Sequence, residues 1–531
     1  MKLIPRLTVM LLLMLTAVVL ISNVRYLYIA PVANSFNWWQ GDETWLMAEA
    51  NHFIHTAHYI NPLAPGSAYS ECSGLLFGSC YVTATIYGIP LLLIKSHTID
   101  AGRTVSWVFA LWTLLALWLI AKRYRVPPVL RAFGCLLFAS TLCFFITSHC
   151  ARSDTLVGLS ILIIVGCLPL MDKKSLGNKD IYLGLLFPCS LLLNGHILIH
   201  TFLLIVYISL SLGTFRNGKS IVRMAGAALA GFVVLLMIQE ILLGSSSLLG
   251  PFSGSSGRMP IMRLFHPKAD MANVSWRLFI VNAWAPAVLW ISIVIVVSMM
   301  WARVRFNIRL SGMEPAAQRM LIGAILVIFP SLFLEYYEPR YLIYVLPTII
   351  LSFILILSYL LKTLPRSSTI VVRIALIVCM TGGLWRYWID TSTIGTGAEK
   401  ITATNNEAVK EALATIHTRH PGVPRIYSTV TAEGVAMDDS CILITPIMYY
   451  QPIDAEATRE DLWKRAKIDY AIVCNPAHSL DWNETDSCID WRDRSNAKMI
   501  FERVGPLWDI GRSYDANDLK LLDTLRVYEF R

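Results

Sequence analysis

The chain has 531 residues, of which 55% are hydrophobic and 15% are charged, and its mean hydropathy is +0.56. A single water-soluble core could not bury so much apolar side-chain surface. The formal net charge of +9 does not indicate nucleic-acid binding, because Lys and Arg form short clusters between apolar runs and no aromatic stacking module accompanies them. The composition therefore predicts a polytopic α-helical membrane protein whose surface contacts membrane lipids and no nucleic acid.

About eleven segments are apolar over most of the length that a membrane-spanning helix needs, which is about 20 residues. They lie near residues 7–24, 104–121, 132–148, 155–170, 181–194, 196–213, 224–243, 278–301, 321–335, 341–361 and 369–388. The first segment could be a cleaved signal peptide, but its length and the lack of a clear small-residue cleavage site favour an uncleaved anchor. We expect about 11–13 transmembrane helices in all.

Residues 78–95 form a further apolar stretch whose placement decides the topology. If this stretch spanned the membrane, the basic loop at residues 122–131 would face outward, against the preference of Lys and Arg for the cytoplasmic side. If it lies in the outer interface or re-enters, every later basic cluster becomes cytoplasmic, and we favour this arrangement. It predicts a multi-pass protein of the inner (plasma) membrane with a cytoplasmic N-terminus and a large first external loop at residues 25–103.

The last part of the chain differs in composition from the apolar remainder. Helical patterns cover residues 405–418 and 459–466, and strand patterns cover residues 425–431, 469–474, 498–504 and 525–530. About 140 residues can form a hydrophobic core of their own. We therefore predict a transmembrane domain at residues 1–389 and an external, periplasmic or extracellular, α/β domain at residues 390–531.

Two adjacent carboxylates, Asp42 and Glu43, follow the first apolar segment in "QGDETWLMAEANHF". Carboxylates near an apolar boundary can act as a general base, as metal ligands or as acceptors for sugar hydroxyls. The start of a helix offers a simpler explanation, because acidic side chains are favourable at the positive end of the helix dipole. The spacing alone favours the helix start.

Charged residues also occur at the external ends of two later spans. Arg152 and Asp154 stand in "SHCARSDTL", where a charge is costly unless it is paired or functional, and a plain ion pair is the alternative explanation. Arg340 stands in "EYYEPRYLIYVLP" beside Tyr341 and could hold a phosphate through forked hydrogen bonds. An interfacial belt of Tyr and Arg would produce the same pattern.

Four of these features together resemble one enzyme superfamily. They are "GDETW" with "AEA" after the first span, the half-apolar stretch before the second, "ARSD" after the third and "EPRYLIYVLP" at a late span. In this order they resemble the GT-C superfamily of glycosyltransferases that use polyprenyl-phosphate sugars, particularly the branch of protein O-mannosyltransferases and lipid A aminoarabinose transferases. The resemblance covers most of the chain and implies a GT-C-like fold. It also implies transfer of one sugar, with inversion, at the outer face of the inner membrane.

The resemblance implies roles for residues of this chain. Asp42 would be the general base that deprotonates the acceptor hydroxyl, Glu43 would support it, and Asp154 would be a second acid that shapes the site. Arg340 would bind the phosphate of the lipid donor, with Tyr341 and Arg152 beside it.

Phosphate contacts elsewhere in the chain are less defined. Further candidates are the basic side chains Lys95, Arg258, Arg263, His266 and Lys268. The Lys-Pro element that the lipid A branch carries late in the first loop is not evident, and Lys95 is its candidate replacement unless it only snorkels to the interface. The other four lie in the Gly/Ser-rich loop at residues 244–277, which could instead be only a mobile lid.

Cofactor and acceptor are constrained less directly. No nucleotide-binding Gly-rich loop is evident, as expected for a donor presented from the membrane, and we predict no cofactor and no metal, although some relatives need a divalent ion. The predicted acceptor is a lipid-linked glycan, lipopolysaccharide or lipid A, or another cell-envelope polymer, with protein as an alternative. A lipid or sugar transporter or flippase is the rival function, which would use charges at mid-span and often repeated halves.

Overall fold

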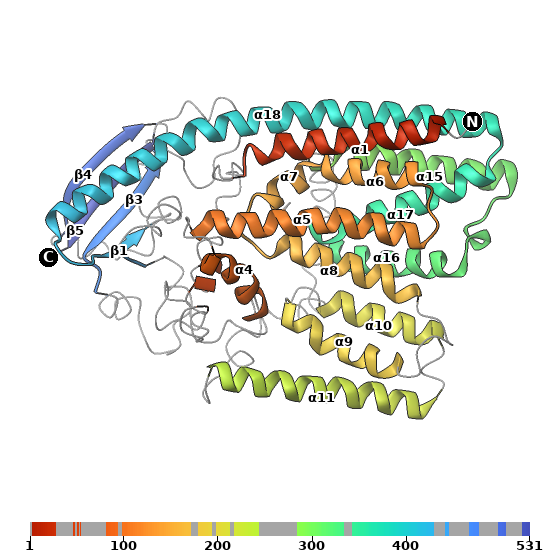
Figure 1. Cartoon of the computed structure of the whole chain (residues 1–531), viewed down its shortest axis with the longest axis horizontal. Coiled ribbons are helices and arrows are strands. Elements are labelled where there is room, and N and C mark those ends of the chain that lie inside the picture. Colours follow the sequence, from red (N-terminus) through yellow and green to blue (C-terminus); the bar gives the residue numbers. More distant parts are fainter. Residues whose placement is uncertain are drawn as a thin grey trace.

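The chain folds into a bundle of apolar helices with a small β-sheet beyond one end of the bundle (Figure 1). The computed structural model describes residues 3–27, 46, 47, 50, 51, 54, 81–93, 98–170, 179–193, 198–212, 217–243, 284–333, 342–428, 441–444, 467–476, 497–505 and 523–530. The bundle contains α1 (Leu3–Val24), α5 (Thr98–Arg123), α6 (Pro128–Ala139), α7 (Leu142–Ser148), α8 (Asp154–Cys167), α9 (Lys179–Leu193), α10 (Leu198–Leu212), α11 (Gly218–Leu243), α15 (Pro286–Phe306), α16 (Pro315–Phe333), α17 (Leu342–Thr363) and the first part of α18 (Arg366–Arg419).

Each apolar segment predicted from the sequence coincides with one of these helices, and the segment at 132–148 coincides with two. Among the described residues, six helices are long and apolar enough to cross a membrane, or seven if the bent pair α6–α7 is one span, and three further apolar helices are shorter. The pair bends by 64°, and the side chain of Thr141 starts α7 afresh by accepting a hydrogen bond from the amide of Phe144 at 3.1 Å. The chain is therefore a polytopic α-helical membrane protein, as predicted. The expected number of about 11–13 spans stays a prediction, because six or seven helices of the described residues have the length of a span.

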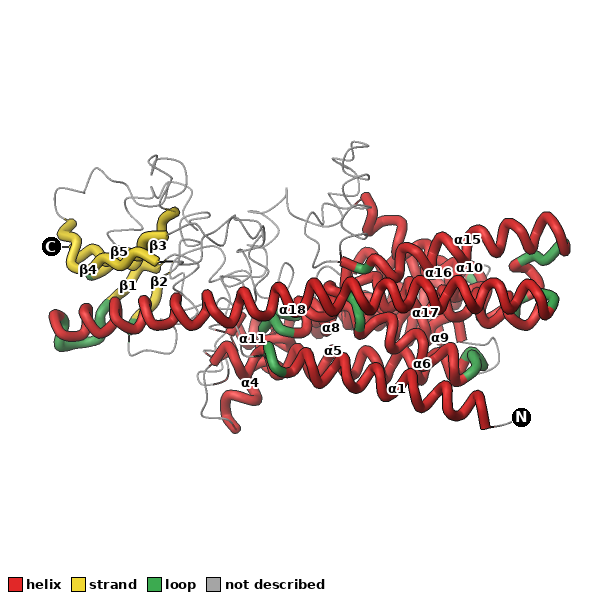
Figure 2. Tube along the Cα trace, turned by 90° about the horizontal axis from the view of Figure 1, so that it is seen from above, coloured by secondary structure: helices red, strands yellow, loops and turns green. Residues whose placement is uncertain are grey.

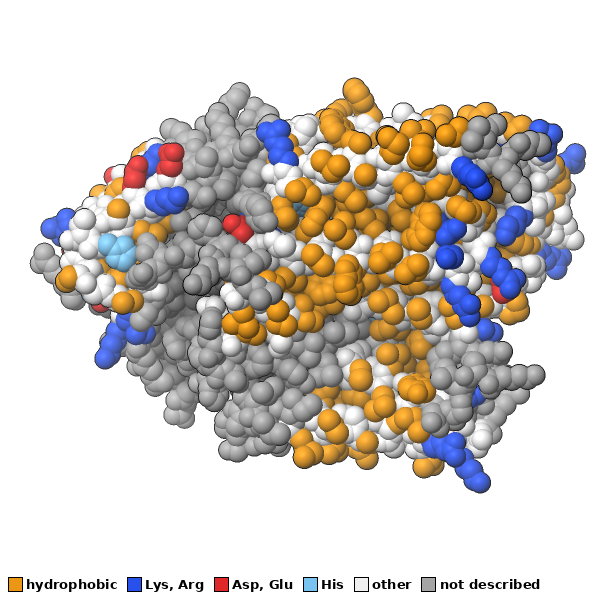
Figure 3. All heavy atoms as spheres, viewed as in Figure 1, with side chains coloured by type: hydrophobic (Ala, Val, Ile, Leu, Met, Phe, Trp, Pro, Cys, Tyr) orange, Lys and Arg blue, Asp and Glu red, His pale blue; other side chains and the backbone are white. Residues whose placement is uncertain are grey.

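Basic side chains gather at one end of the bundle, which we call the basic end (Figure 3). The exposed basic residues at or next to the helix ends there include Lys122, Arg123, Arg125, Arg303, Arg305, Arg309, Lys362 and Arg366. Helix α1 also begins at this end, and apolar side chains cover the band between the two ends (Figures 1 and 3). This segregation is what the positive-inside preference requires if the basic end is cytoplasmic; the orientation itself stays a prediction.

Helix α4 (Tyr81–Leu93) corresponds to the stretch that decided the predicted topology. Its 13 residues span roughly 20 Å at 1.5 Å per residue, well short of the roughly 30 Å apolar core of a bilayer. It packs on α5 at the end of the bundle opposite the basic end (Figure 1). A helix of this length and position agrees with an interfacial segment better than with a span.

The sheet contains β1 (Arg425–Ser428), β2 (Ile442–Ile444), β3 (Tyr470–Pro476), β4 (Ala497–Gly505) and β5 (Asp523–Phe530) in the order β2-β1-β3-β5-β4. Strands β2, β1 and β3 are parallel, β5 is antiparallel to both β3 and β4, and the register pairs Ile472 with Val527. One face of the sheet buries apolar side chains against the last turns of α18, among them Val409 and Ile416. Four strands occupy predicted positions, β2 was not predicted, and the helix predicted at 459–466 lies outside the described residues.

Helix α18 connects the two parts of the molecule. It runs for 54 residues without a break, from the basic end along the whole bundle to the strands (Figure 2). The boundary predicted between residues 389 and 390 therefore falls inside this helix, although the division into two domains stays a prediction. A continuous helix of this kind carries the sheet on the same rigid element that crosses the bundle.

Candidate active site

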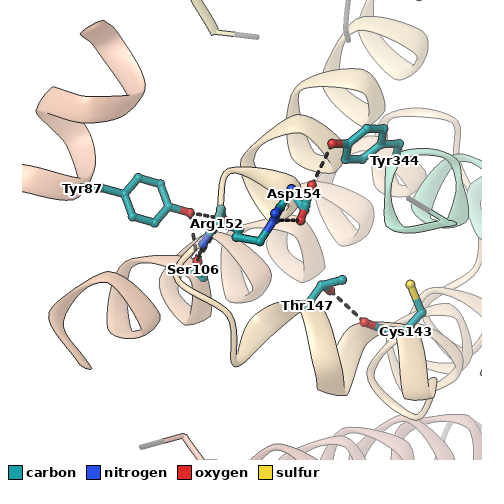
Figure 4. Close-up of polar contacts among 7 residues, drawn as sticks. All are labelled: Tyr87, Ser106, Cys143, Thr147, Arg152, Asp154 and Tyr344. Atoms are coloured by element: carbon teal, nitrogen blue, oxygen red, sulfur yellow. Dashed lines mark hydrogen bonds and ion pairs between the residues drawn. The ribbon is translucent and has the colours of Figure 1, made fainter. Parts of the chain in front are cut away.

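Polar side chains come together where α8 begins (Figure 4), toward the end of the bundle opposite the basic end (Figure 1); we call this the site end. Asp154 is the first residue of α8 and is only 2% exposed. The Nε of Arg152 donates to one carboxylate oxygen of Asp154 at 2.9 Å, and the hydroxyl of Tyr344 donates to the other at 2.7 Å. A buried carboxylate is costly unless it is paired and hydrogen-bonded. Both conditions are met here, and both oxygens of Asp154 are engaged.

A close crossing of α8 and α17 brings Tyr344 to Asp154. Gly158 lies one turn into α8, and a Cβ at this position would stand 2.6 Å from the carbonyl oxygen of Ile343. Only a residue without a side chain allows this approach, and Tyr344 is the next residue along α17. The contact between Tyr344 and Asp154 therefore depends on Gly158 of α8, which allows the close approach, and on the tyrosine of α17.

The turn that carries Arg152 is held from the opposite side by α4 and α5. The hydroxyl of Tyr87 donates to the main-chain carbonyl of Arg152 and lies 2.8 Å from the hydroxyl of Ser106. Ser106 Oγ accepts from the amide of Arg152 at 3.3 Å and donates to its carbonyl at 3.1 Å. Burial raises the pKa of Tyr87, so the phenol stays neutral and keeps its proton to donate. Figure 4 shows the two hydroxyls converging on Arg152 while Tyr344 approaches Asp154 from α17.

Part of the predicted first external loop packs against the same turn. Met47 fills the space beside Gly102, where a Cβ would stand 2.3 Å from the Met47 sulfur and 2.7 Å from the Cβ of Ala151. Leu46, Met47, Ala50, Tyr87, Val105 and Ala151 form one buried apolar cluster. Met47 follows Asp42 by five residues, and Ala151 precedes Asp154 by three. The segment after the acidic pair therefore contacts the turn that carries the second acid.

The structure brings two of the predicted site residues together, Arg152 and Asp154. The other predicted residues lie outside the described residues, and their roles stay predictions: Asp42, Glu43, Lys95, Arg258, Arg263, His266, Lys268, Arg340 and Tyr341. The plain ion pair that the sequence offered for Arg152 and Asp154 is present, but it belongs to a larger buried network. Among the described residues, no three His, Cys, Asp or Glu side chains are grouped as metal ligands would be.

Three residues of the network were not predicted: Tyr87, Ser106 and Tyr344. Tyr344 stands one helical turn after Arg340 in "EPRYLIYVLP", so its spacing was a usable signal. Tyr87 lies in the ambiguous apolar stretch, and Ser106 lies within a predicted span, where a lone hydroxyl is ordinary. Neither of these two residues carried a signal that the sequence could distinguish from packing.

The whole chain is similar in structure to ArnT from Cupriavidus metallidurans, the lipid A aminoarabinose transferase. The crystal structure of ArnT bound to undecaprenyl phosphate matches with a TM-score of 0.54 and 12% identity, over 98% of this chain and 97% of that chain. The apo structure matches with a TM-score of 0.52 and 13% identity over the same shares. No protein-family model and no curated protein sequence matches the chain.

The chain has the GT-C fold. This confirms the fold that the sequence motifs implied. The oligosaccharyltransferase of Archaeoglobus fulgidus, in complex with Zn and sulfate, matches less of its own length, with a TM-score of 0.43, 10% identity and coverage of 86% of this chain and 67% of that chain. At such identities the likeness concerns the fold, and the chemistry has to be argued from the residues of this chain.

Proposed function

We propose that this chain is an integral membrane glycosyltransferase that moves one sugar from a polyprenyl-phosphate donor to an acceptor at the site end of the bundle. The observation that carries the proposal is the buried network of Arg152, Asp154 and Tyr344. The neighbouring Ala151 shares a buried apolar cluster with Met47, five residues after Asp42. The fold supports the class of donor, because ArnT shares this fold over nearly its full length and binds undecaprenyl phosphate.

The chemistry needs a base for the acceptor hydroxyl, stabilisation of the departing phosphate, and alignment of donor with acceptor. We assign the base to Asp42, supported by Glu43, and inversion at the sugar carbon follows from a single displacement. Asp154 suits a different role. Because Arg152 and Tyr344 occupy its two oxygens, it fixes the local geometry and supplies a placed negative charge. Asp42 and Asp154 are thus given different roles, and Asp154 receives its role from its hydrogen-bonded environment.

Phosphate binding is assigned to basic side chains around the site. Arg340 is the principal candidate, with Tyr341 beside it, because a guanidinium forms two parallel hydrogen bonds to phosphate oxygens. The supporting candidates are Arg152, Lys95, Arg258, Arg263, His266 and Lys268. Neither a cofactor nor a metal ion is part of the proposal.

The acceptor belongs to a hydroxyl-bearing class that reaches the outer face of the inner membrane. We propose a lipid-linked glycan, lipopolysaccharide or lipid A, or another envelope polymer, and a protein hydroxyl would suit the same base. A transporter or flippase would place its charges at mid-span. Asp154 instead begins a helix at one end of the bundle, which favours the transferase.

The test uses the full-length chain in proteoliposomes with undecaprenyl-phosphate sugars and an envelope extract as the source of acceptor. We expect release of undecaprenyl phosphate that depends on acceptor, and a fall of about 100-fold or more in Asp42→Asn, since a general base typically contributes at least that much. Full activity of Asp42→Asn at equal protein level would contradict the assigned mechanism. Movement of the intact donor across the bilayer without release of undecaprenyl phosphate would favour the flippase.

A further inference from the structure

We propose that Tyr87 is a positioning residue for the transfer: through the carbonyl of Arg152 it ties α4 and the segment after Asp42 to the turn that carries Asp154. The inference rests on the proposed function for its catalytic consequence, but the contact itself is a property of the fold. The hydroxyl of Tyr87 contacts the main chain of Arg152 and not its guanidinium, so its effect has to pass through Arg152 and its neighbours.

The hydroxyl of Tyr87 is one of two that hold the main chain of Arg152. Tyr87 donates to the carbonyl oxygen, and Ser106 accepts from the amide at 3.3 Å. The two hydroxyls lie 2.8 Å apart. The peptide groups on both sides of Arg152 are therefore fixed in direction by groups from α4 and α5.

Helix α4 also contacts the segment that follows Asp42. At Gly88, the neighbour of Tyr87, a Cβ would stand 2.8 Å from the carbonyl oxygen of Ala50, so the two backbones are nearly in contact. Tyr87 shares its buried cluster with Met47 and Ala151. On this short helix Gly88 contacts the region after the proposed base, and Tyr87 contacts the turn that carries the second acid.

The hydroxyl does something that the ring alone does not. Apolar packing is non-directional, and a phenylalanine ring would fill the same space in the cluster. A hydrogen bond to a carbonyl has a preferred line, so it sets the rotation of the turn and with it the direction in which Arg152 leaves the backbone. Burial of the hydroxyl without a partner would be unfavourable, and burial raises the pKa of Tyr87, which keeps the donor protonated.

The test compares two variants that each remove one buried phenol hydroxyl. Tyr87→Phe removes the bond to Arg152, and Tyr124→Phe removes a bond of the same kind, from Tyr124 Oη to the carbonyl of Gly166 at 2.9 Å near the basic end. For Tyr87→Phe we expect kcat to fall about tenfold and the KM for the lipid donor to change less than kcat, because small misplacements of reacting groups reduce rates steeply. Tyr124→Phe should lose similar thermal stability and keep its kcat. Equal kcat values for the two variants would overturn the inference.

A second measurement does not depend on activity. Hydrogen–deuterium exchange in nanodiscs should become faster at the amides of residues 150–156 in Tyr87→Phe and stay unchanged there in Tyr124→Phe. Suppose that this exchange pattern is seen and the wild-type chain releases no polyprenyl phosphate from any polyprenyl-phosphate sugar. That result would support the contact and refute the proposed function. An active wild type whose Tyr87→Phe variant alters neither exchange nor kcat would refute the inference and leave the function standing.

A third variant covers the case in which Tyr87→Phe fails to fold. Ser106→Ala removes the other hydroxyl on Arg152, and we expect the same direction of change in exchange and kcat with a smaller amplitude. Unchanged exchange at residues 150–156 in this variant would count against the inference.

Discussion

The two ends of α8 are held in similar ways and differ in charge. At the basic end Tyr124 donates to the carbonyl of Gly166 at 2.9 Å. Arg319 donates at 2.8 Å to the carbonyl of Pro169, two residues after the last residue of α8. At the site end Tyr87 donates to the carbonyl of Arg152. Of these two helix ends, the site end also buries a carboxylate, that of Asp154.

The comparison distinguishes contacts that helix capping explains from the burial of a charge, which capping does not explain. Unpaired carbonyls at the C-terminal end of a helix attract cations and donors, so Tyr124 and Arg319 are explained by capping alone. An acid at the first turn of a helix is equally favourable when solvated, but Asp154 is 2% exposed and engages Arg152 and Tyr344 as well. Burial of this carboxylate has a desolvation cost that helix capping does not require. We therefore attribute the burial to the function of the site.

The largest expected effect comes from neutralising that charge. In Asp154→Asn the guanidinium of Arg152 loses its buried anion, and we expect a loss of about 3 kcal/mol in the free energy of unfolding and at least about a 100-fold loss of transfer rate. Thermal unfolding in detergent and the phosphate-release assay measure the two.

The matched change at the basic end is Arg319→Gln. It removes a cap from a helix end, so about 1 kcal/mol and no more than a twofold change in rate are expected. A similar loss of transfer rate in both variants would erase the distinction between the two ends.

A smaller effect is expected from the crossing of α8 and α17. Gly158→Ala places a methyl group 2.6 Å from the carbonyl oxygen of Ile343, so the helices must separate at a cost of about 1–3 kcal/mol. Because Tyr344 then withdraws from Asp154, the transfer rate should fall as well. Thermal unfolding and the transfer assay again provide the measurement.

Gly226 on α11 supplies the control, since a Cβ there meets no atom of the described residues within 4 Å. Gly226→Ala should be neutral or more stable by up to about 1 kcal/mol, as expected from helix propensity. If Gly158→Ala behaves like Gly226→Ala, the close crossing does not position Tyr344.

The smallest effect is expected at an exposed ion pair of similar length. Arg503 on β4 lies 2.8 Å from Glu411 on α18, with side chains 27% and 58% exposed. We expect Arg503→Gln to change the free energy of unfolding by less than about 1 kcal/mol, because solvent screens such pairs. A loss as large as that of Asp154→Asn, measured by thermal unfolding, would show that burial does not distinguish the two pairs.

Residues that act locally were predictable from the sequence, and residues that act through distant partners were not. Apolar length placed the helices because it is a property of each segment alone, and the cost of a charge at a span boundary identified Arg152 and Asp154. Tyr87 and Tyr344 find their partners 65 and 190 positions away along the chain. Their hydroxyls are tolerated in any apolar helix. Nothing local distinguished Tyr87, and the local signal for Tyr344 was its position one helical turn after Arg340.

Two features of the fold were missed for related reasons. The bend between α6 and α7 falls at Ser140 and Thr141, small polar residues that a continuous span also accepts. Strand β2 has three residues and exists through its parallel pairing with β1. In both cases the tertiary environment decided between conformations that the local sequence allows.

The most direct measurement is the acceptor-dependent release of undecaprenyl phosphate by the full-length chain in proteoliposomes, with Asp42→Asn, Asp154→Asn and Arg319→Gln compared at equal protein level. The proposed mechanism predicts release by the wild type and by Arg319→Gln, and at least about a 100-fold loss of release in each of the two aspartate variants. Undiminished release by either aspartate variant, or no release by the wild type with any polyprenyl-phosphate sugar, would contradict it.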